Sequence, residues 1–399
     1  MDYYNKTRLG CYLSLSMQAY CACCLPILFV SLINLYQLTY TDLGIMIFLL
    51  YSVQIIVDIL VSPLLTKFGY KLFCLLTPLV LIFGVLIFVL SPVLIPSNVK
   101  ILFFVGISII SMAAGLIEVL VSPLIEALPS KNKEKSMSLL HSFYGIGVIF
   151  VVSVTSLLVT LLDETFWQLI MVSFLFIPIV VFIIFLKAKF VEVNKEQKKK
   201  DHLYYLKDYH FYFFLLAIMF GAAMEIIMSQ WLSTFFVKTL HISKLIGDML
   251  GVLSFTITFT IGRLGYSYLD QKYELNNLLI IGSLLSLISY LTLVFVDNLY
   301  IVILACLLCG IGVSLMWPGT LSVGAKYFHN PSPSYFGMMS AFGDLGAALF
   351  PYLIGLIVDL YFVNNGFGLK FAFVVGSIIS FLTVIIQLYL KKITKSHRD

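Results

Sequence analysis

Apolar segments long enough to cross a membrane recur along almost the whole chain. A helix that spans the hydrocarbon core of a bilayer needs about 20 apolar residues, and all its backbone hydrogen bonds are satisfied within the segment. Spans are predicted at 9–33, 42–66, 71–93, 98–128, 136–161, 165–187, 209–236, 244–268, 275–296, 298–326, 335–360 and 368–390. We therefore expect an all-α membrane protein with twelve transmembrane helices.

The composition indicates the same class of protein. Of the 399 residues, 61% are hydrophobic and only 11% are charged, which is far from the average of soluble domains. The polar connections are too short to hold a large soluble domain. We expect a multi-pass protein of a bacterial plasma membrane that is embedded in the lipid bilayer and acts as a monomer.

Basic residues are concentrated on alternate connections, and such residues are retained on the cytoplasmic side of membrane proteins. One set of connections carries Lys6, Arg8, Lys67, Lys71, Lys131, Lys133, Lys135, Lys187, Lys189, Lys195, Lys198, Lys199, Lys200, Lys207, Lys272, Lys326, Lys391, Lys392, Lys395 and Arg398. The other set carries only Lys100, Lys238, Lys244 and Lys370. Both termini are therefore predicted to be cytoplasmic. The net charge of +5 follows from this asymmetry, and no nucleic-acid partner is expected.

The two halves of the chain are predicted to be repeats. The longest polar run, VEVNKEQKKKDHLYYLKD, lies at the midpoint, which is typical of a linker between two bundles. We expect an N-terminal six-helix bundle at 1–187, a cytoplasmic linker at 188–208 and a C-terminal six-helix bundle at 209–399. GLIEVLVSP at 115–123 matches GIGVSLMWP at 310–318 in its Gly and Pro, and HSFYGIGV at 141–148 matches SAFGDLGA at 340–347. Two pseudo-symmetric bundles are the simplest explanation.

These strings resemble the major facilitator superfamily and, within it, the fucose permease group of sugar permeases. Gly115, Glu118 and Ser122-Pro123 are similar to that group's fourth helix. GAAMEIIMSQW at 221–231 is similar to its seventh helix, and GTL after Trp317-Pro318 to its tenth. The superfamily's loop signature survives in part as TKFGYK at 66–71, and its counterpart at 262–273 keeps Arg263 and Asp270. The resemblance implies the major facilitator fold and secondary transport of a sugar.

Two glutamates near the middle of their spans, Glu118 and Glu225, are the first candidates for a substrate site. Ionisable side chains are costly in hydrocarbon, so those that remain normally face a cavity or a partner. The resemblance places the family's coupling glutamate at Glu118, which would carry a proton or accept a solute hydroxyl; the alternative is a static packing residue. The remaining substrate or coupling candidates are Gln54, Tyr144, Gln230, Trp231 and Trp317.

Four charged or titratable residues are predicted to lie deeper toward the cytoplasm and to form a gate: Asp58, His141, Arg263 and Asp344. By analogy with the superfamily, Asp58 would approach Asp344 and His141 would approach Arg263. Fixed structural pairing is the alternative. Prolines are expected to kink several spans, at Pro26, Pro78, Pro123, Pro178, Pro318 and Pro351.

The sequence does not determine which ion, if any, is coupled to transport. The fucose permease group carries an aspartate in its first helix, and we expect its position near Ala22, but the first span contains no acidic residue. Proton symport, coupling to a cation such as sodium, and uniport all remain possible interpretations.

The predicted function is alternating-access transport of a small neutral hydroxylated solute, with a sugar preferred. The first alternative is an exporter of drugs or amphipathic metabolites, but the span 136–161 has no proline and so lacks the antiporter signature of the fifth helix. The second is a membrane-embedded enzyme or a sensor, for which the sequence shows neither a nucleophile constellation nor an output domain. We expect no enzymatic activity, no cofactor and no metal site.

Overall fold

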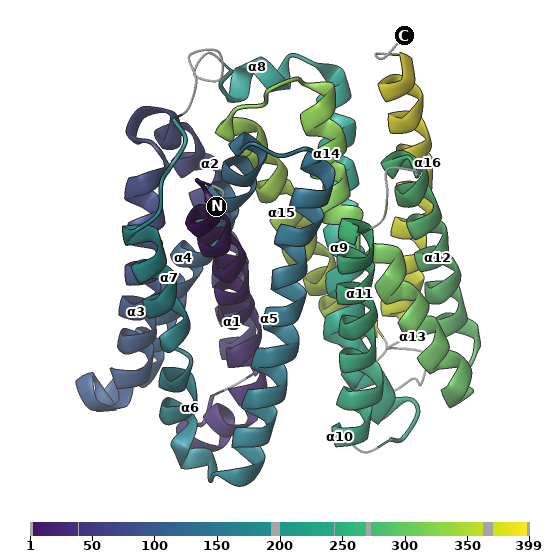
Figure 1. Cartoon of the computed structure of the whole chain (residues 1–399). Coiled ribbons are helices and arrows are strands. Elements are labelled where there is room, and N and C mark those ends of the chain that lie inside the picture. Colours follow the sequence, from purple (N-terminus) through teal and green to yellow (C-terminus); the bar gives the residue numbers. More distant parts are fainter. Residues whose placement is uncertain are drawn as a thin grey trace. The chain divides into compact units, whose positions relative to one another are not determined.

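The computed structural model describes residues 3–38, 40–192, 200–242, 244–268, 273–361 and 370–396, and these residues form helices joined by short connections (Figure 1). The longer helices are α1 (Asn5–Tyr36), α2 (Tyr40–Phe68), α3 (Tyr70–Leu94), α4 (Val99–Ala127), α5 (Lys133–Leu161), α9 (Tyr209–Lys238), α11 (Ser254–Tyr268), α12 (Leu275–Phe295), α13 (Leu299–Val313), α14 (Met316–Tyr327), α15 (Pro333–Tyr361) and α16 (Lys370–Ser396). The shorter ones are α6 (Trp167–Ser173), α7 (Phe176–Leu186), α8 (His202–Leu206) and α10 (Lys244–Gly247).

Eleven segments among the described residues are long and apolar enough to cross a membrane. Each overlaps one of the predicted spans, and the predicted span 244–268 is the one without a counterpart. There a π-helical stretch, Asp248–Leu253, separates α10 from α11. α11 alone has 15 residues, so at ~1.5 Å per residue it reaches across the ~30 Å hydrocarbon core only together with the helical residues 244–253 that precede it. An eighth membrane span at 244–268 therefore stays a prediction.

Two further spans are interrupted where the sequence analysis expected one helix with a kink. The α6–α7 break comprises Phe174 and Leu175, and the α13–α14 break comprises Ser314 and Leu315. Each break begins four residues before a proline, Pro178 or Pro318. Proline lacks the N–H that would bond the carbonyl four residues earlier, and its ring also clashes with that carbonyl. The proline thus explains where each helix ends.

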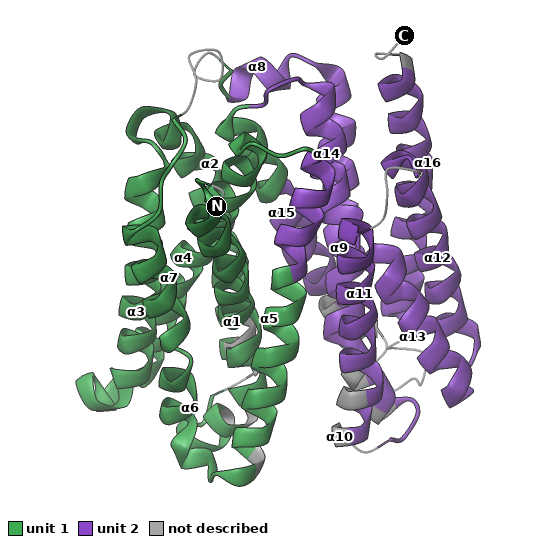
Figure 2. Cartoon of the chain, in the orientation of Figure 1, with its two compact units in different colours: residues 1–131, 143–201, 332–341 green, residues 132–142, 202–331, 342–399 purple. Residues whose placement is uncertain are grey.

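The chain divides into two compact units (Figure 2). Unit 1 comprises residues 1–131, 143–201 and 332–341, and unit 2 comprises residues 132–142, 202–331 and 342–399. The first turns of α5 therefore belong to unit 2 and the first turns of α15 to unit 1. The predicted bundle limits, 1–187 and 209–399, stay a prediction.

In unit 1, α4 packs against α1, α2 and α3. A small residue allows α4 to approach α2 closely, because a Cβ added to Gly115 on α4 would lie 2.9 Å from the Val57 Cβ and 3.1 Å from the Gln54 Cα of α2. Small residues let helix backbones approach closely in a membrane. This approach brings the polar residues of α2 next to those of α4.

In unit 2, α13 packs against α11 and α12, and α9 packs against α14 and α16. Gly262 on α11 lies against the α13–α14 break, since a Cβ at this position would come within 2.7 Å of the Ser314 Cβ. The residue after Gly262 is Arg263, so the same close approach carries a buried cation to the break.

Candidate functional site

In unit 1, a carboxylate and an amide meet between α4 and α1. The Gln18 Nε2 on α1 donates a hydrogen bond to the Glu118 Oε1 on α4. Gln18 is buried, and Glu118 is partly buried. The second carboxylate oxygen, Oε2, is also buried, and within the described parts of the chain it has no hydrogen-bond partner. Since a buried polar atom normally has a partner, Oε2 is an acceptor available to a ligand.

Asp58 on α2 lies beside this pair. One oxygen of its carboxylate is within 4.8 Å of one oxygen of the Glu118 carboxylate. Two ionised carboxylates at this separation repel by about 3–4 kcal/mol at an effective dielectric constant of ~20. A proton on one of them, or a cation beside them, relieves this repulsion.

The closeness of Asp58 and Glu118 does not fix their depths in a membrane. Asp58 lies ten residues before Phe68, where α2 ends, and Glu118 lies nine residues before Ala127, where α4 ends. The predicted order of depths, in which Asp58 lies nearer the cytoplasm, stays a prediction.

The other candidates in unit 1 are Gln54 and Tyr144. Gln54 is buried on α2, and its Nε2 donates to the Leu50 carbonyl of the same helix at 2.9 Å. Tyr144 on α5 is partly buried. Gln54 therefore commits its amide donor to its own helix, and its side chain stands near the close approach of α2 to α4.

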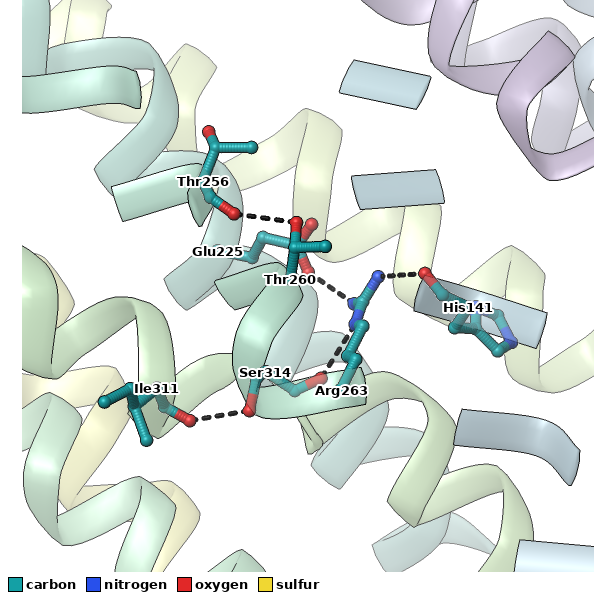
Figure 3. A network of polar contacts seen from close by, with 7 residues as sticks. All are labelled: His141, Glu225, Thr256, Thr260, Arg263, Ile311 and Ser314. Carbon is teal, nitrogen blue, oxygen red and sulfur yellow. Dashed lines mark hydrogen bonds and ion pairs between the residues drawn. The ribbon is translucent and has the colours of Figure 1, made fainter. Parts of the chain in front are cut away.

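In unit 2, the Arg263 guanidinium is the centre of a buried polar network (Figure 3). Its Nε donates to the Ser314 carbonyl at 2.8 Å, and its Nη1 donates to the His141 carbonyl at 3.1 Å. Its Nη2 lies 3.3 Å from the Glu225 Oε2 and forms an ion pair. The side chains of Arg263 and Glu225 are 3% and 14% exposed. The guanidinium stays charged and carries five N–H donors, so a buried arginine needs several acceptors.

An aromatic ring covers one face of the guanidinium. The Cζ of Arg263 lies 3.7 Å from the centre of the Phe259 ring, one helical turn earlier on α11. Arginine stacks favourably on aromatic faces. The Ser138 hydroxyl on α5 adds a contact by donating to the Arg263 carbonyl at 2.6 Å. Stacking and backbone contacts together fix the guanidinium plane.

The predicted pair of His141 and Arg263 is in contact, but not through the imidazole. Arg263 reaches the main-chain carbonyl of His141, and the ring points away from the guanidinium (Figure 3). The long arginine side chain reaches Glu225, and the predicted division into a central Glu225 and a deeper Arg263 stays a prediction. Whether these residues form a gate stays a prediction.

The remaining candidates in unit 2 do not join this network. On α9, Gln230 is exposed, and the Nε1 of the partly buried Trp231 has no hydrogen-bond partner in the described residues. Trp317 on α14 packs its ring against Gly343 on α15, where a Cβ would overlap it. Asp344, the next residue, is buried. Trp317 thus takes part in helix packing, and its role at a substrate site stays a prediction.

Two of the predicted features lie outside these contacts. Asp58 belongs to unit 1 and Asp344 to unit 2, so their predicted approach stays a prediction. Asp270 and Lys272, which belong to the partial loop signature, lie outside the described residues, as do residues 193–199 of the linker and Arg398.

Gln18, Phe259 and Ser314 were not among the predicted site residues. Gln18 lies four residues before Ala22, where the sequence analysis sought an acidic residue. Residues four apart share a helix face, so the polar partner of Glu118 is an amide one turn earlier. Its polar character within an apolar span was the available signal. Phe259 and Ser314 give no such signal, because both residue types are common in membrane helices.

Charged side chains buried within a multi-pass helical membrane protein are typical of membrane transporters. The chain belongs to the Major Facilitator Superfamily, whose family model matches residues 10–351 and 245–399. It is accordingly an integral membrane transporter and not an enzyme. A comparison with curated protein sequences gives no match.

Solved structures of the same fold include two sugar transporters. The chain is similar to the E. coli fucose:proton symporter FucP (TM-score 0.74, 17% identity, 96% of this chain and 99% of that chain). It is also similar to the proton:xylose symporter XylE (TM-score 0.81, 13% identity, 96% and 94%). A third is the human organic anion transporter MFSD10 (TM-score 0.72, 13% identity, 97% and 100%). At these identities the likeness establishes the fold alone.

Proposed function

We propose that this chain is a secondary transporter of a small neutral hydroxylated solute, with a sugar as the preferred class. Twelve spans in two six-helix bundles, with both termini in the cytoplasm of a bacterium, would give it alternating access. The observation that carries the proposal is the pair formed by Gln18 and Glu118, with one buried carboxylate oxygen that has no partner in the described residues.

The chemistry of this pair suits a hydroxyl group. A carboxylate oxygen accepts a hydrogen bond, whereas an amide both donates and accepts. A neutral polyol offers donors and acceptors on neighbouring carbons and matches both groups at once. The printed names of FucP and XylE, which are fucose and xylose symporters, support a sugar.

The two carboxyl groups of unit 1 support coupling to an ion. The carboxylates of Asp58 and Glu118 repel when both are ionised, so a proton or a sodium ion there would be stabilised. FucP and XylE are named as proton symporters, which favours the proton. Glu118 is the proposed carrier because it also meets Gln18, and solute and proton would then share one carboxylate.

In unit 2, the ion pair of Arg263 and Glu225 is proposed to act as a gate contact. A buried, hydrogen-bonded ion pair stabilises one arrangement of the two helices that carry it. All its contacts break together when either residue moves. His141 joins the contact through its carbonyl. Breaking and remaking this network would accompany the transport cycle.

The test is a panel of neutral sugars, polyols and sugar acids in proteoliposomes that contain a pH-sensitive dye. Wild type, Glu118→Gln and the control Glu126→Gln, on the same helix, are compared. We expect uptake of a neutral solute with acidification of the lumen, loss of that proton signal in Glu118→Gln, and no change in Glu126→Gln. Transport that is unaltered in Glu118→Gln would exclude this residue from the mechanism, and sodium-dependent uptake without acidification would assign the other ion.

The panel also tests export. Vesicles of both orientations are compared under an imposed proton gradient of either sign. Accumulation only in inside-out vesicles, with amphipathic compounds preferred to sugars, would replace the proposal by a drug or metabolite exporter.

A further inference from the structure

The two proline breaks leave one main-chain carbonyl each without its helical donor. In the α6–α7 break this carbonyl belongs to Phe174, four residues before Pro178, and in the α13–α14 break it belongs to Ser314, four residues before Pro318. In an unbroken helix each would accept from the N–H at the proline position. Both carbonyls therefore need another donor, because a buried acceptor without one is unfavourable.

The two carbonyls find different donors. The Phe174 carbonyl accepts the N–H of Ile177 at 3.0 Å, so a tighter turn in the same segment satisfies it. The Ser314 carbonyl accepts the Nε–H of Arg263 at 2.8 Å, from another helix and 51 positions earlier in the chain. The carbonyl at the first break is satisfied within its own segment, whereas the carbonyl at the second is satisfied by a side chain of another helix.

The Arg263 guanidinium is well suited to hold this second break. Nη1 and Nη2 contact the His141 carbonyl and Glu225, and the Phe259 ring lies against one face. These contacts fix its plane, so Nε points at Ser314 with little freedom. Gly262, the preceding residue, leaves the space that allows α11 to approach the break.

We propose that Arg263 is a positioning residue that replaces the N–H missing at Pro318 and holds the α13–α14 break closed. We call this break the joint, because the arrangement of α13 and α14 at Ser314 and Leu315 depends on a tertiary contact. Because Glu225 on α9 binds the same guanidinium, a movement of Glu225 is passed to Ser314 and the start of α14. This inference goes beyond the proposed function, and its test needs no solute.

A double-mutant cycle tests the replacement directly. Pro318→Ala restores an N–H that can donate to the Ser314 carbonyl, so this carbonyl no longer depends on Arg263. We expect Arg263→Gln to lower the Tm of the purified protein, and to lower it by a smaller amount when Pro318→Ala is also present, because only the loss at the Ser314 carbonyl is then recovered. Pro178→Ala is the matched control, since its break is already closed by Ile177, and it should leave the loss in Tm unchanged.

Equal losses in Tm with and without Pro318→Ala would overturn the proposal. If Arg263→Gln does not fold, Arg263→Lys is used, because it keeps the positive charge beside Glu225 but lacks the Nε–H donor. Hydrogen exchange at the amides of residues 315–317, 319 and 320 is then the measurement. We expect faster exchange in Arg263→Lys and slower exchange when Pro318→Ala is added. Exchange in Arg263→Lys at the wild-type rate would likewise reject the assignment.

Discussion

Gln18 on α1 donates a hydrogen bond to Glu118 on α4, so the polar partner of this membrane carboxylate is a neutral amide. An amide cannot take up a proton from Glu118, but it can orient the carboxylate and share a solute hydroxyl with it. The Asp58 carboxylate, within 4.8 Å, then supplies the second titratable group. Gln18 thus orients the Glu118 carboxylate, whereas Asp58 influences its charge. Substitutions at these two positions can change one property without the other.

Gln18→Leu should weaken solute binding. Leucine has a similar volume but no donor, so the Glu118 carboxylate loses the contact that orients it. A hydrogen bond to a charged group contributes about 1.5–3 kcal/mol, which corresponds to a roughly 10- to 100-fold loss of affinity. Binding of the solute that the transport panel identifies is measured by calorimetry. Gln37→Leu, at the end of α1, is the control; equal affinities for wild type and Gln18→Leu would refute a role in binding.

Asp58→Asn should stabilise the protein and disturb coupling. The substitution removes one of two neighbouring negative charges, and the repulsion it relieves is about 3–4 kcal/mol at most. Residues of a functional site often lower the stability of the protein in this way. The gain in Tm should be larger at about pH 8 than at about pH 5, because protonation of either carboxyl already relieves the wild type at low pH. A gain that is independent of pH would show that repulsion is not the cause.

Arg263→Leu should be strongly destabilising, because it leaves the Glu225 carboxylate without its counter-ion. Removing one partner of a buried ion pair costs about 3–5 kcal/mol. The double variant Arg263→Leu/Glu225→Leu should recover part of this loss but not all of it, since the carbonyls of Ser314 and His141 remain without the guanidinium. Thermal unfolding of the three variants measures both effects. Full recovery in the double variant would mean that the two carbonyl contacts contribute nothing.

Gly262→Ala should destabilise unit 2 by about 1–3 kcal/mol, as overpacking does. The added Cβ would lie 2.7 Å from the Ser314 Cβ, which cannot rotate away. Gly265→Ala is the matched control, because nothing lies within 4 Å of a Cβ there, and alanine favours a helix by about 1 kcal/mol over glycine. Opposite shifts in Tm are expected. A tolerated Gly262→Ala would mean that α11 can withdraw from the break at no cost.

The sequence carried much of the fold and part of the site. Glu118, Glu225 and Arg263 were found because a charge within an apolar span is conspicuous and costly. The partners were harder to find, because the pairing of Gln18 with Glu118 is a tertiary contact between α1 and α4 that no local pattern encodes. The order of depths stays a prediction at Asp58, because it depends on helix ends that a sequence places only to within a few residues.

At the prolines, too, the sequence predicts a local feature but not the tertiary contact that decides its outcome. Pro123 and Pro318 occupy matching positions in the repeated strings, yet α4 continues through Pro123 and the second segment breaks before Pro318. The sequence could predict a weak point at each. Whether the helix opens there depends on the surroundings of the freed carbonyl, and at Ser314 these include a guanidinium from α11.

Trp317 stands two residues after the α13–α14 break, with its ring packed on Gly343, and the chain contains only two other tryptophans, Trp167 and Trp231. An indole in such a place changes its emission when its packing changes. Replacing Trp167 and Trp231 by phenylalanine would thus leave a native fluorophore at the joint, and opening could be followed in real time without a chemical label.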